Sequence, residues 1–260
     1  MIRSAIYYTI RSAARTWLRV FDRTPQPPIV IEEPEPESPG FQTFIGKCEF
    51  QGDFGGPRQT LSAAQLLQGM TLPPYFTYTT HTATPQLAFF GQRNGTEQFR
   101  TELRHADEWP AAIGTNVMHI RLSISDSELN EYTWAQIHRK AAVSVPPPLR
   151  LTWDKQRSGI AQHLWAVVRR DSGSYERYDL GPRVEGFMDV RIELTDLTLT
   201  VTIDGTVRHS QTLADWAGYN TCYFKYGLYL TGSASSGGSV DCVVESVDAY
   251  NSIITNVHSV

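Results

Sequence analysis

Short stretches of alternating polar and apolar residues, separated by turn signals, recur through residues 41–251. Residues 118–125 and 189–194 alternate in the way that is typical of strands with one buried face. Residues 197–203 and 206–210 flank an Asp-Gly pair, which favours a β-hairpin with a two-residue turn. Many short strands must bury their apolar faces against one another. The pattern therefore predicts an all-β sandwich or jelly roll.

Residues 240–250 are a further expected strand, and residues 62–68 are the one clear helix, with Ser62 as its N-cap. Hydrophobic residues make up 41% of the chain and charged residues 19%, which suffices for a sizeable core. No apolar run is long enough for a transmembrane helix. The formal net charge of -4 argues against a dedicated nucleic-acid-binding protein.

The cysteine count limits metal and disulfide chemistry. Cys48, Cys222 and Cys242 are too few for a zinc ribbon or a dense disulfide framework. They allow at most one bridge, for which we consider the pairing Cys222–Cys242. The sequence also contains no HExxH motif and no EF-hand loop.

Residues 1–40 differ in composition from the rest of the chain. As a helix, residues 1–23 would place four arginines on one face: Arg3, Arg11, Arg15 and Arg19. A membrane-surface helix, an organellar targeting segment and a poorly ordered extension all remain open for it. Residues 24–40 hold six of the 15 prolines, which predicts an extended linker. We therefore divide the chain into residues 1–40, a folded domain at 41–251 and a tail at 252–260.

The first of three polar strand faces lies in residues 99–105. Alternation places Arg100, Glu102 and Arg104 on the same side. A carboxylate between two guanidiniums can hold both through charge-assisted hydrogen bonds, giving a rigid cationic strip suited to carboxylate ligands. The alternative is a solvated strand face with ordinary surface ion pairs.

The second polar face lies in residues 132–140. Alternation places five side chains on it: Tyr132, Trp134, Gln136, His138 and Lys140. Flat aromatic rings suit sugars, an amide can donate to a carboxylate, and a neutral imidazole can accept a proton. The alternative is that Gln136 and His138 satisfy each other at a sheet surface.

The third polar face lies in residues 222–231, where Tyr223, Lys225, Gly227 and Tyr229 alternate onto one side. Gly227 leaves space for the approach of a backbone or a ligand. Lys225 is about 13 Å from Tyr229 along a strand, so we expect it to meet a different part of an elongated ligand. The alternative is an amphipathic strand with a snorkelling lysine.

Together these motifs resemble polysaccharide lyase family 7, the alginate lyases with a β-jelly-roll fold. That family carries R-[TS]-E-L-R, Q-[IV]-H and Y-F-K-A-G-x-Y in this order, and the matching segments here are residues 100–104, 136–138 and 223–229. The resemblance covers about residues 41–251. It implies a jelly-roll sandwich of two antiparallel sheets with a concave substrate groove, few short helices, no metal and no cofactor.

The resemblance implies β-elimination at a uronic acid, in which the C5 proton leaves and the 4-O-glycosidic bond breaks. Removing that proton builds negative charge beside a carboxylate, so fixed donors that neutralise the carboxylate stabilise the transition state. Arg100 and Gln136 are implied in this role, with His138 assisting them or acting as the base. Tyr229 is implied as the acid that protonates the leaving oxygen, and in syn elimination also as the base.

The polar faces and the resemblance together predict six substrate-binding residues: Glu102, Arg104, Trp134, Lys140, Tyr223 and Lys225. Glu102 would orient the arginines, while Arg104 and Lys225 would bind flanking carboxylates along the groove. The resemblance also implies a preference for guluronate or mixed blocks, because the Q-I-H motif with Ile137 is similar to that of family members that accept them. Tyr226 and residues 230–231 depart from the family pattern, which leaves glucuronan or another uronan open as the substrate.

The expected partner is thus an anionic polysaccharide, bound by a monomer that does not bind nucleic acid. Because such a polymer does not cross membranes, we expect an extracellular enzyme, although residues 1–23 are not a clear secretory signal. Two other function classes stay open at this point. One is a non-catalytic carbohydrate-binding protein, and the other is a membrane-tethered structural protein that rests on residues 1–23 alone.

Overall fold

A computed structural model describes the chain over six ranges: residues 41–54, 57–79, 86–93, 98–141, 145–230 and 237–252. The predictions for residues 1–40, for Thr231 and for the tail beyond Ser252 lie outside these ranges. Within them, no helix combines the length and the apolar character that crossing a membrane requires.

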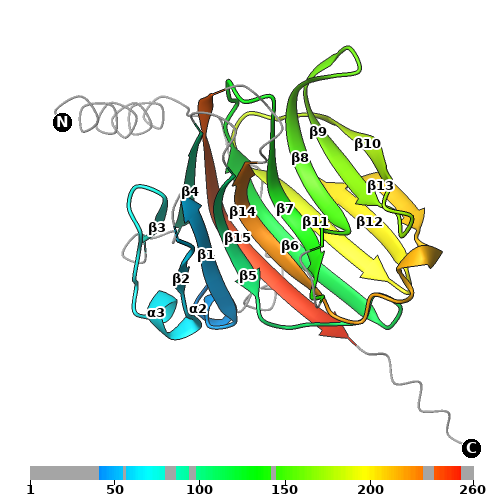
Figure 1. The fold of residues 1–260 in the computed structure, drawn as a ribbon, viewed down its shortest axis with the longest axis horizontal. Coiled ribbons are helices and arrows are strands. Elements are labelled where there is room, and N and C mark those ends of the chain that lie inside the picture. Colours follow the sequence, from blue (N-terminus) through cyan, green and yellow to red (C-terminus); the bar gives the residue numbers. More distant parts are fainter. Residues whose placement is uncertain are drawn as a thin grey trace, which may run out of the picture. The chain divides into compact units, whose positions relative to one another are not determined.

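Two antiparallel sheets form the fold (Figure 1). Sheet A has the strand order β10 (Tyr175–Pro182), β9 (Ile160–Arg169), β8 (Leu149–Arg157), β7 (Glu131–Arg139), β14 (Cys222–Leu230), β5 (Phe99–His105), β1 (Cys48–Phe54) and β2 (Gln59–Leu61). Sheet B has the order β13 (Thr206–Thr212), β12 (Thr198–Ile203), β11 (Met188–Thr195), β6 (Thr115–Ile124), β15 (Gly238–Ser252), β4 (Gln86–Arg93) and β3 (Phe76–Thr79). Strands far apart in sequence are therefore neighbours, and β14 lies between β7 and β5.

The core lies between the two sheets and follows from the alternation of the strands. In β11, Val190, Ile192 and Leu194 are buried while the residues between them are partly exposed. Ile137 of β7 in sheet A belongs to the same buried cluster. A strand such as β11 thus buries one face and leaves the other for polar side chains. The predicted all-β jelly-roll sandwich is confirmed.

The local predictions for the helix and the hairpin are also confirmed. Helix α3 (Ala63–Leu67) begins after Ser62, whose hydroxyl accepts from the backbone N–H of Gln65, while the Gln65 side chain accepts from the backbone N–H of Ser62. The other short helices are α2 (Phe41–Ile45) and η1 (Ala214–Trp216). Between β12 and β13, Asp204 and Gly205 have φ values of 48° and 73°, as a two-residue type I′ turn requires.

The considered disulfide between Cys222 and Cys242 is wrong. Cys222 lies on β14 of sheet A and Cys242 on β15 of sheet B. Both thiols are free and buried, and so is the thiol of Cys48.

Candidate active site

The three motif strands are neighbours in sheet A, and their register brings the polar faces together. Across β14 and β5, Lys225 is opposite Arg104 and Tyr229 is opposite Arg100. Across β14 and β7, Lys225 is opposite Gln136. Directly opposite residues share a face of a sheet, so the three motifs point to the same side.

Gly227 allows β14 to lie this close to β5. Its φ of 120° is a conformation that residues with a side chain rarely adopt. A Cβ at this position would lie 2.3 Å from the carbonyl oxygen of Thr101 and 2.9 Å from the Cα of Glu102. The space predicted at this position is thus taken by the neighbouring backbone.

Glu102 is the centre of a buried cluster on this face. Lys225 Nζ donates to its Oε2 at 2.6 Å, and Arg100 Nε lies 3.0 Å from the same oxygen. Gln136 Nε2 donates to Oε1. We call Arg100, Glu102, Gln136 and Lys225 the Glu102 cluster. Glu102 thus orients one of the two arginines, as predicted, but also holds the amide and the ammonium group.

Lys225, which the sequence predicts to bind a substrate carboxylate, has a protein carboxylate as its partner in the structure. Lys225 is 3% exposed and its ammonium group is paired with Glu102. Burial lowers the pKa of Lys225, and the negative charge of Glu102 opposes that shift. The strand register, which the sequence does not reveal, places the two side chains together. Lys225 therefore positions Glu102.

Arg104, Tyr223 and His138 form a stack beside the cluster. The Arg104 guanidinium carbon lies 4.1 Å from the centre of the Tyr223 ring, and that ring stacks on His138 with a centroid distance of 5.3 Å. Arg104 pairs with Glu108 and not with Glu102, which corrects the predicted role of Glu102 toward the second arginine. Lys140 is largely exposed and lies 3.7 Å from Glu108.

Sequence reasoning missed Glu108, although its i,i+4 spacing from Arg104 is a readable signal for an ion pair. Its carboxylate lies between Arg104 and Lys140 and offsets part of their positive charge.

His138 is a neutral imidazole under physiological conditions. Burial lowers its pKa to about 4, and the positive charges of Lys225 and Arg100 add to that shift. The Nδ1 atom lies 2.8 Å from the backbone nitrogen and 2.9 Å from the carbonyl oxygen of Arg139, so the backbone holds this edge of the ring. The other ring nitrogen, Nε2, is left to meet a ligand.

Tyr229 completes the arrangement. Its ring lies under the Arg100 guanidinium, with 4.7 Å between the guanidinium carbon and the ring centre. The side chain is partly exposed, unlike the buried leucines on either side of it. The predicted guanidinium, amide, imidazole and phenol therefore meet on one face of three adjacent strands. This is the combination that proton transfer beside a neutralised carboxylate requires.

A β-bulge in β7 corrects the second predicted face. Thr133 is opposite Thr152 of β8, yet Ala135 is opposite the adjacent Leu151, so Trp134 is an extra residue. Strict alternation therefore fails here. Tyr132 and Trp134 are buried in the core instead of sharing the face of Gln136, and Trp134 is not available to bind substrate.

Comparisons with known proteins agree with this geometry. A family model described as alginate lyase matches residues 51–253. The chain belongs to the alginate lyase family. It is therefore a polysaccharide lyase. No curated protein sequence matches it significantly.

Solved structures share the fold of this lyase at low sequence identity. Alginate lyase AlyC3 is 19% identical, with a TM-score of 0.69 over 82% of this chain and 93% of its own. Alginate lyase A1-II', described as a member of polysaccharide lyase family 7, is 21% identical, with a TM-score of 0.65 over 81% and 96%. An alginate lyase from Pseudomonas aeruginosa is 24% identical, with a TM-score of 0.63 over 80% and 99%.

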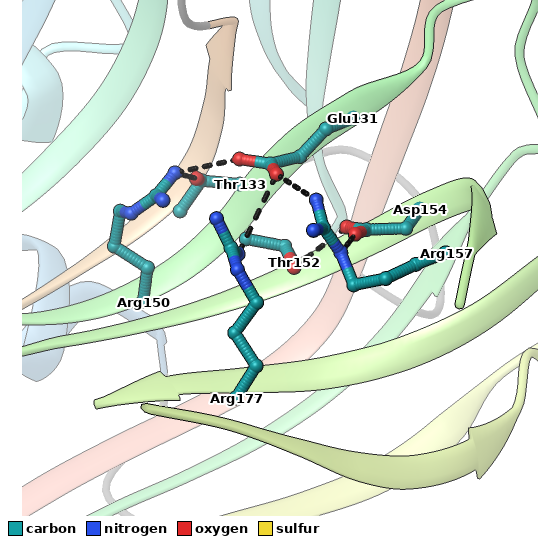
Figure 2. Close-up of polar contacts among 7 residues, drawn as sticks. All are labelled: Glu131, Thr133, Arg150, Thr152, Asp154, Arg157 and Arg177. Carbon is teal, nitrogen blue, oxygen red and sulfur yellow. Dashed lines mark hydrogen bonds and ion pairs between the residues drawn. The ribbon is translucent and has the colours of Figure 1, made fainter. Parts of the chain in front are cut away.

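The lyase carries a second charged cluster on sheet A that sequence reasoning missed (Figure 2). Glu131 at its centre pairs with three arginines: Arg150, Arg157 and Arg177. Asp154, Thr133 and Thr152 complete what we call the Glu131 cluster. The alternating Arg150, Thr152 and Asp154 are a readable signal on β8. In the described ranges of the lyase, no group of three or more His, Cys, Asp or Glu side chains could hold a metal ion.

Proposed function

We propose that this enzyme cleaves 1,4-linked polyuronate at the Glu102 cluster, preferring alginate with guluronate or mixed blocks. The observation that carries the proposal is the meeting of Arg100, Gln136, His138 and Tyr229 on one face of sheet A. Family relatives support the substrate class, since AlyC3 was solved with dimannuronate and A1-II' with a substrate labelled GGMG.

Neutralisation of the substrate carboxylate falls to Arg100 and Gln136. Both are oriented by Glu102 before any ligand arrives, so little reorganisation is needed when charge develops. Arg100 contacts Glu102 through Nε, which leaves its two terminal nitrogens for the substrate. Gln136 is buried, and its amide nitrogen donates one of its two hydrogens to Glu102.

Proton transfer falls to His138 and Tyr229. His138 Nε2 takes the C5 proton of the uronate in the tautomer whose ring hydrogen is on Nδ1 and is donated to the Arg139 carbonyl oxygen, because Nε2 is then an unprotonated acceptor. The electrons of the C5–H bond form the C4–C5 double bond, and the C4–O bond breaks. The leaving oxygen takes the hydroxyl proton of Tyr229. The products are a new reducing end and a 4,5-unsaturated uronate end.

Substrate preference rests on less direct features. Ile137 is fully buried, so any influence of the Q-I-H motif on the sugar epimer is indirect. Tyr226 packs in the core with ring centroids 5.8 Å from Phe44 and 5.9 Å from Phe89, so this departure from the family pattern does not reach the polar face. Glucuronan is the second candidate substrate, because Thr231 replaces a residue that is longer in the family.

The test is product analysis with purified enzyme on polymannuronate, polyguluronate, mixed alginate and glucuronan. Ultraviolet absorbance of the unsaturated uronate reports each turnover. We expect the highest kcat/KM on substrates that contain guluronate. The absence of product from all four polymers with folded protein would refute the lyase proposal, and faster turnover of glucuronan would refute the preference.

We also propose that the enzyme acts outside the cell, since its substrate is a large polyanion. Activity assays on the culture medium and on the washed cells of a producing strain test this. Activity confined to the cell interior would contradict it.

A further inference from the structure

The Glu131 cluster continues the polar face of the active site. Arg150 on β8 is directly opposite Gln136 on β7. Arg150 is in turn opposite Val167 on β9, and Val167 is opposite Arg177 on β10. Neighbouring strands are about 4.8 Å apart. The backbone of Arg150 is therefore one strand, or about 5 Å, from that of Gln136, and the backbone of Arg177 is three strands, or about 14 Å, away in the same direction across the sheet.

Positive charge exceeds negative charge in this cluster. Glu131 accepts from Arg150 Nη1 and from Arg157 Nη2, each at 2.9 Å, and its Oε2 lies 3.6 Å from Arg177 Nη1. Asp154 pairs with Arg157 alone. Three guanidiniums therefore share two carboxylates, as the converging side chains in Figure 2 show.

Two of the arginines keep donors unused. Arg150 Nη1 serves Glu131 and Thr133, and its other N–H groups have no hydrogen-bond partner in the part of the chain that the structure describes. Arg177 makes an ion pair but no hydrogen bond there, and its side chain is 31% exposed. Burial and the charges of Arg157 and Arg150 lower the pKa of Arg177, while Glu131 raises it. An added anion would relieve this repulsion.

We propose that Arg150 and Arg177 form a subsite for a carboxylate of the polyuronate, separate from the carboxylate of the sugar that is cleaved. The inference rests on the proposed function. A polyuronate carries one carboxylate on every sugar, and planar guanidiniums bind carboxylates through paired N–H groups. Glu131 holds the arginines in place before the polymer arrives.

The test compares Arg177→Ala with wild type on oligouronates of increasing length and on the polymer. Arg177 is the better target because its ion pair is the longest in the cluster. We expect KM for the polymer to rise about three- to tenfold with kcat unchanged. The shortest oligomers that are cleaved should show no change, since they do not reach Arg177. Arg191→Ala, which removes a partly exposed arginine from β11 of sheet B, is the matched control and should behave as wild type.

The outcomes separate the subsite from the proposed function. Failure of the wild-type enzyme to turn over any polyuronate refutes the function, and the subsite with it. Normal wild-type turnover with equal changes at every oligomer length, or with no change, refutes the subsite alone. Arg177→Lys keeps the charge but not the planar fork, so it should recover part of the loss. Thermal unfolding of each variant detects a folding defect, and the length dependence of KM remains interpretable in any variant that folds.

Discussion

Two carboxylates on the same sheet face each collect several nitrogen donors, yet their surroundings differ. Glu102 is 1% exposed and its partners include an equally buried lysine. The Glu131 side chain is 15% exposed and its three arginines are open to solvent to differing degrees. The buried cluster holds reacting groups in fixed positions, whereas the more open cluster keeps donors available. We therefore propose chemistry beside the first carboxylate and ligand binding beside the second.

The largest expected effect concerns the chemical step beside the Glu102 cluster. Tyr229→Phe removes the proton that the leaving oxygen needs, so kcat should fall by about 10²–10⁴-fold. Binding of an oligouronate, measured by calorimetry, should be nearly unchanged.

Tyr250→Phe is the matched control, because Tyr250 is an exposed tyrosine on β15 of sheet B. It should retain full turnover. Comparable rates for the two variants would remove Tyr229 from the mechanism.

The next largest effect is a difference in unfolding free energy between variants of Glu102 and Glu131. Glu102→Ala leaves the buried Lys225 ammonium unpaired, which should cost about 3–5 kcal/mol of unfolding free energy. Glu131→Ala should cost about 1 kcal/mol or less, because water can solvate the released arginines. Urea denaturation measures both values.

Lys225→Met in the Glu102→Ala background provides the control, since it removes the unpaired charge and should restore much of the lost stability. Equal losses in the two single variants would show that burial does not distinguish the clusters.

The pH dependence of turnover sharpens the assignment of His138. Because burial lowers its pKa to about 4, the basic form is already populated at pH 5, and kcat/KM should fall only as the pH drops toward about 4. The unfolding free energy should also fall as the pH drops, because the imidazole of the unfolded chain binds a proton near pH 6.5 while that of the folded chain does not. The stability contribution is complete above that pH and is lost between there and about pH 4.

Rate profiles of wild type and His138→Ala, with the folded fraction measured at each pH, check this prediction. An acid limb near pH 6.5 in the wild type would contradict the buried, neutral imidazole. If the fall in kcat/KM at low pH were the same in His138→Ala, a group other than His138 would be responsible for it.

The smallest expected effect comes from salt. At about 1 M salt the screening length falls to about 3 Å, which weakens exposed charges far more than buried ones. KM for the polymer should therefore rise severalfold while kcat and unfolding free energy change little. If salt lowered kcat and left KM unchanged, the result would contradict the assignment of binding to the Glu131 cluster and of chemistry to the Glu102 cluster.

Much of the fold and part of the site could be predicted from the sequence. The alternation in residues 118–125 and 189–194, the Asp-Gly turn and the Ser62 cap all act locally, so they are readable without tertiary information. The motif residues Arg100, Gln136, His138 and Tyr229 could be placed on polar faces for the same reason.

What could not be predicted depends on strand register. The pairing of Lys225 with Glu102 joins residues 123 positions apart, and no local pattern reports it. The Glu131 cluster likewise joins side chains from β7, β8 and β10. The burial of Trp134 follows from one extra residue in β7, which interrupts an otherwise regular alternation.

The extra residue in β7 decides which side chains on either side of it point to the polar face. On its C-terminal side β7 contributes Gln136 and His138 to the polar face of sheet A, and on its N-terminal side it contributes Glu131 and Thr133. Shortening the strand by one position at Trp134 would leave either half in place but send the other half's side chains into the interior. The Glu102 cluster and the Glu131 cluster therefore share one face of sheet A only because Trp134 is an extra residue in β7.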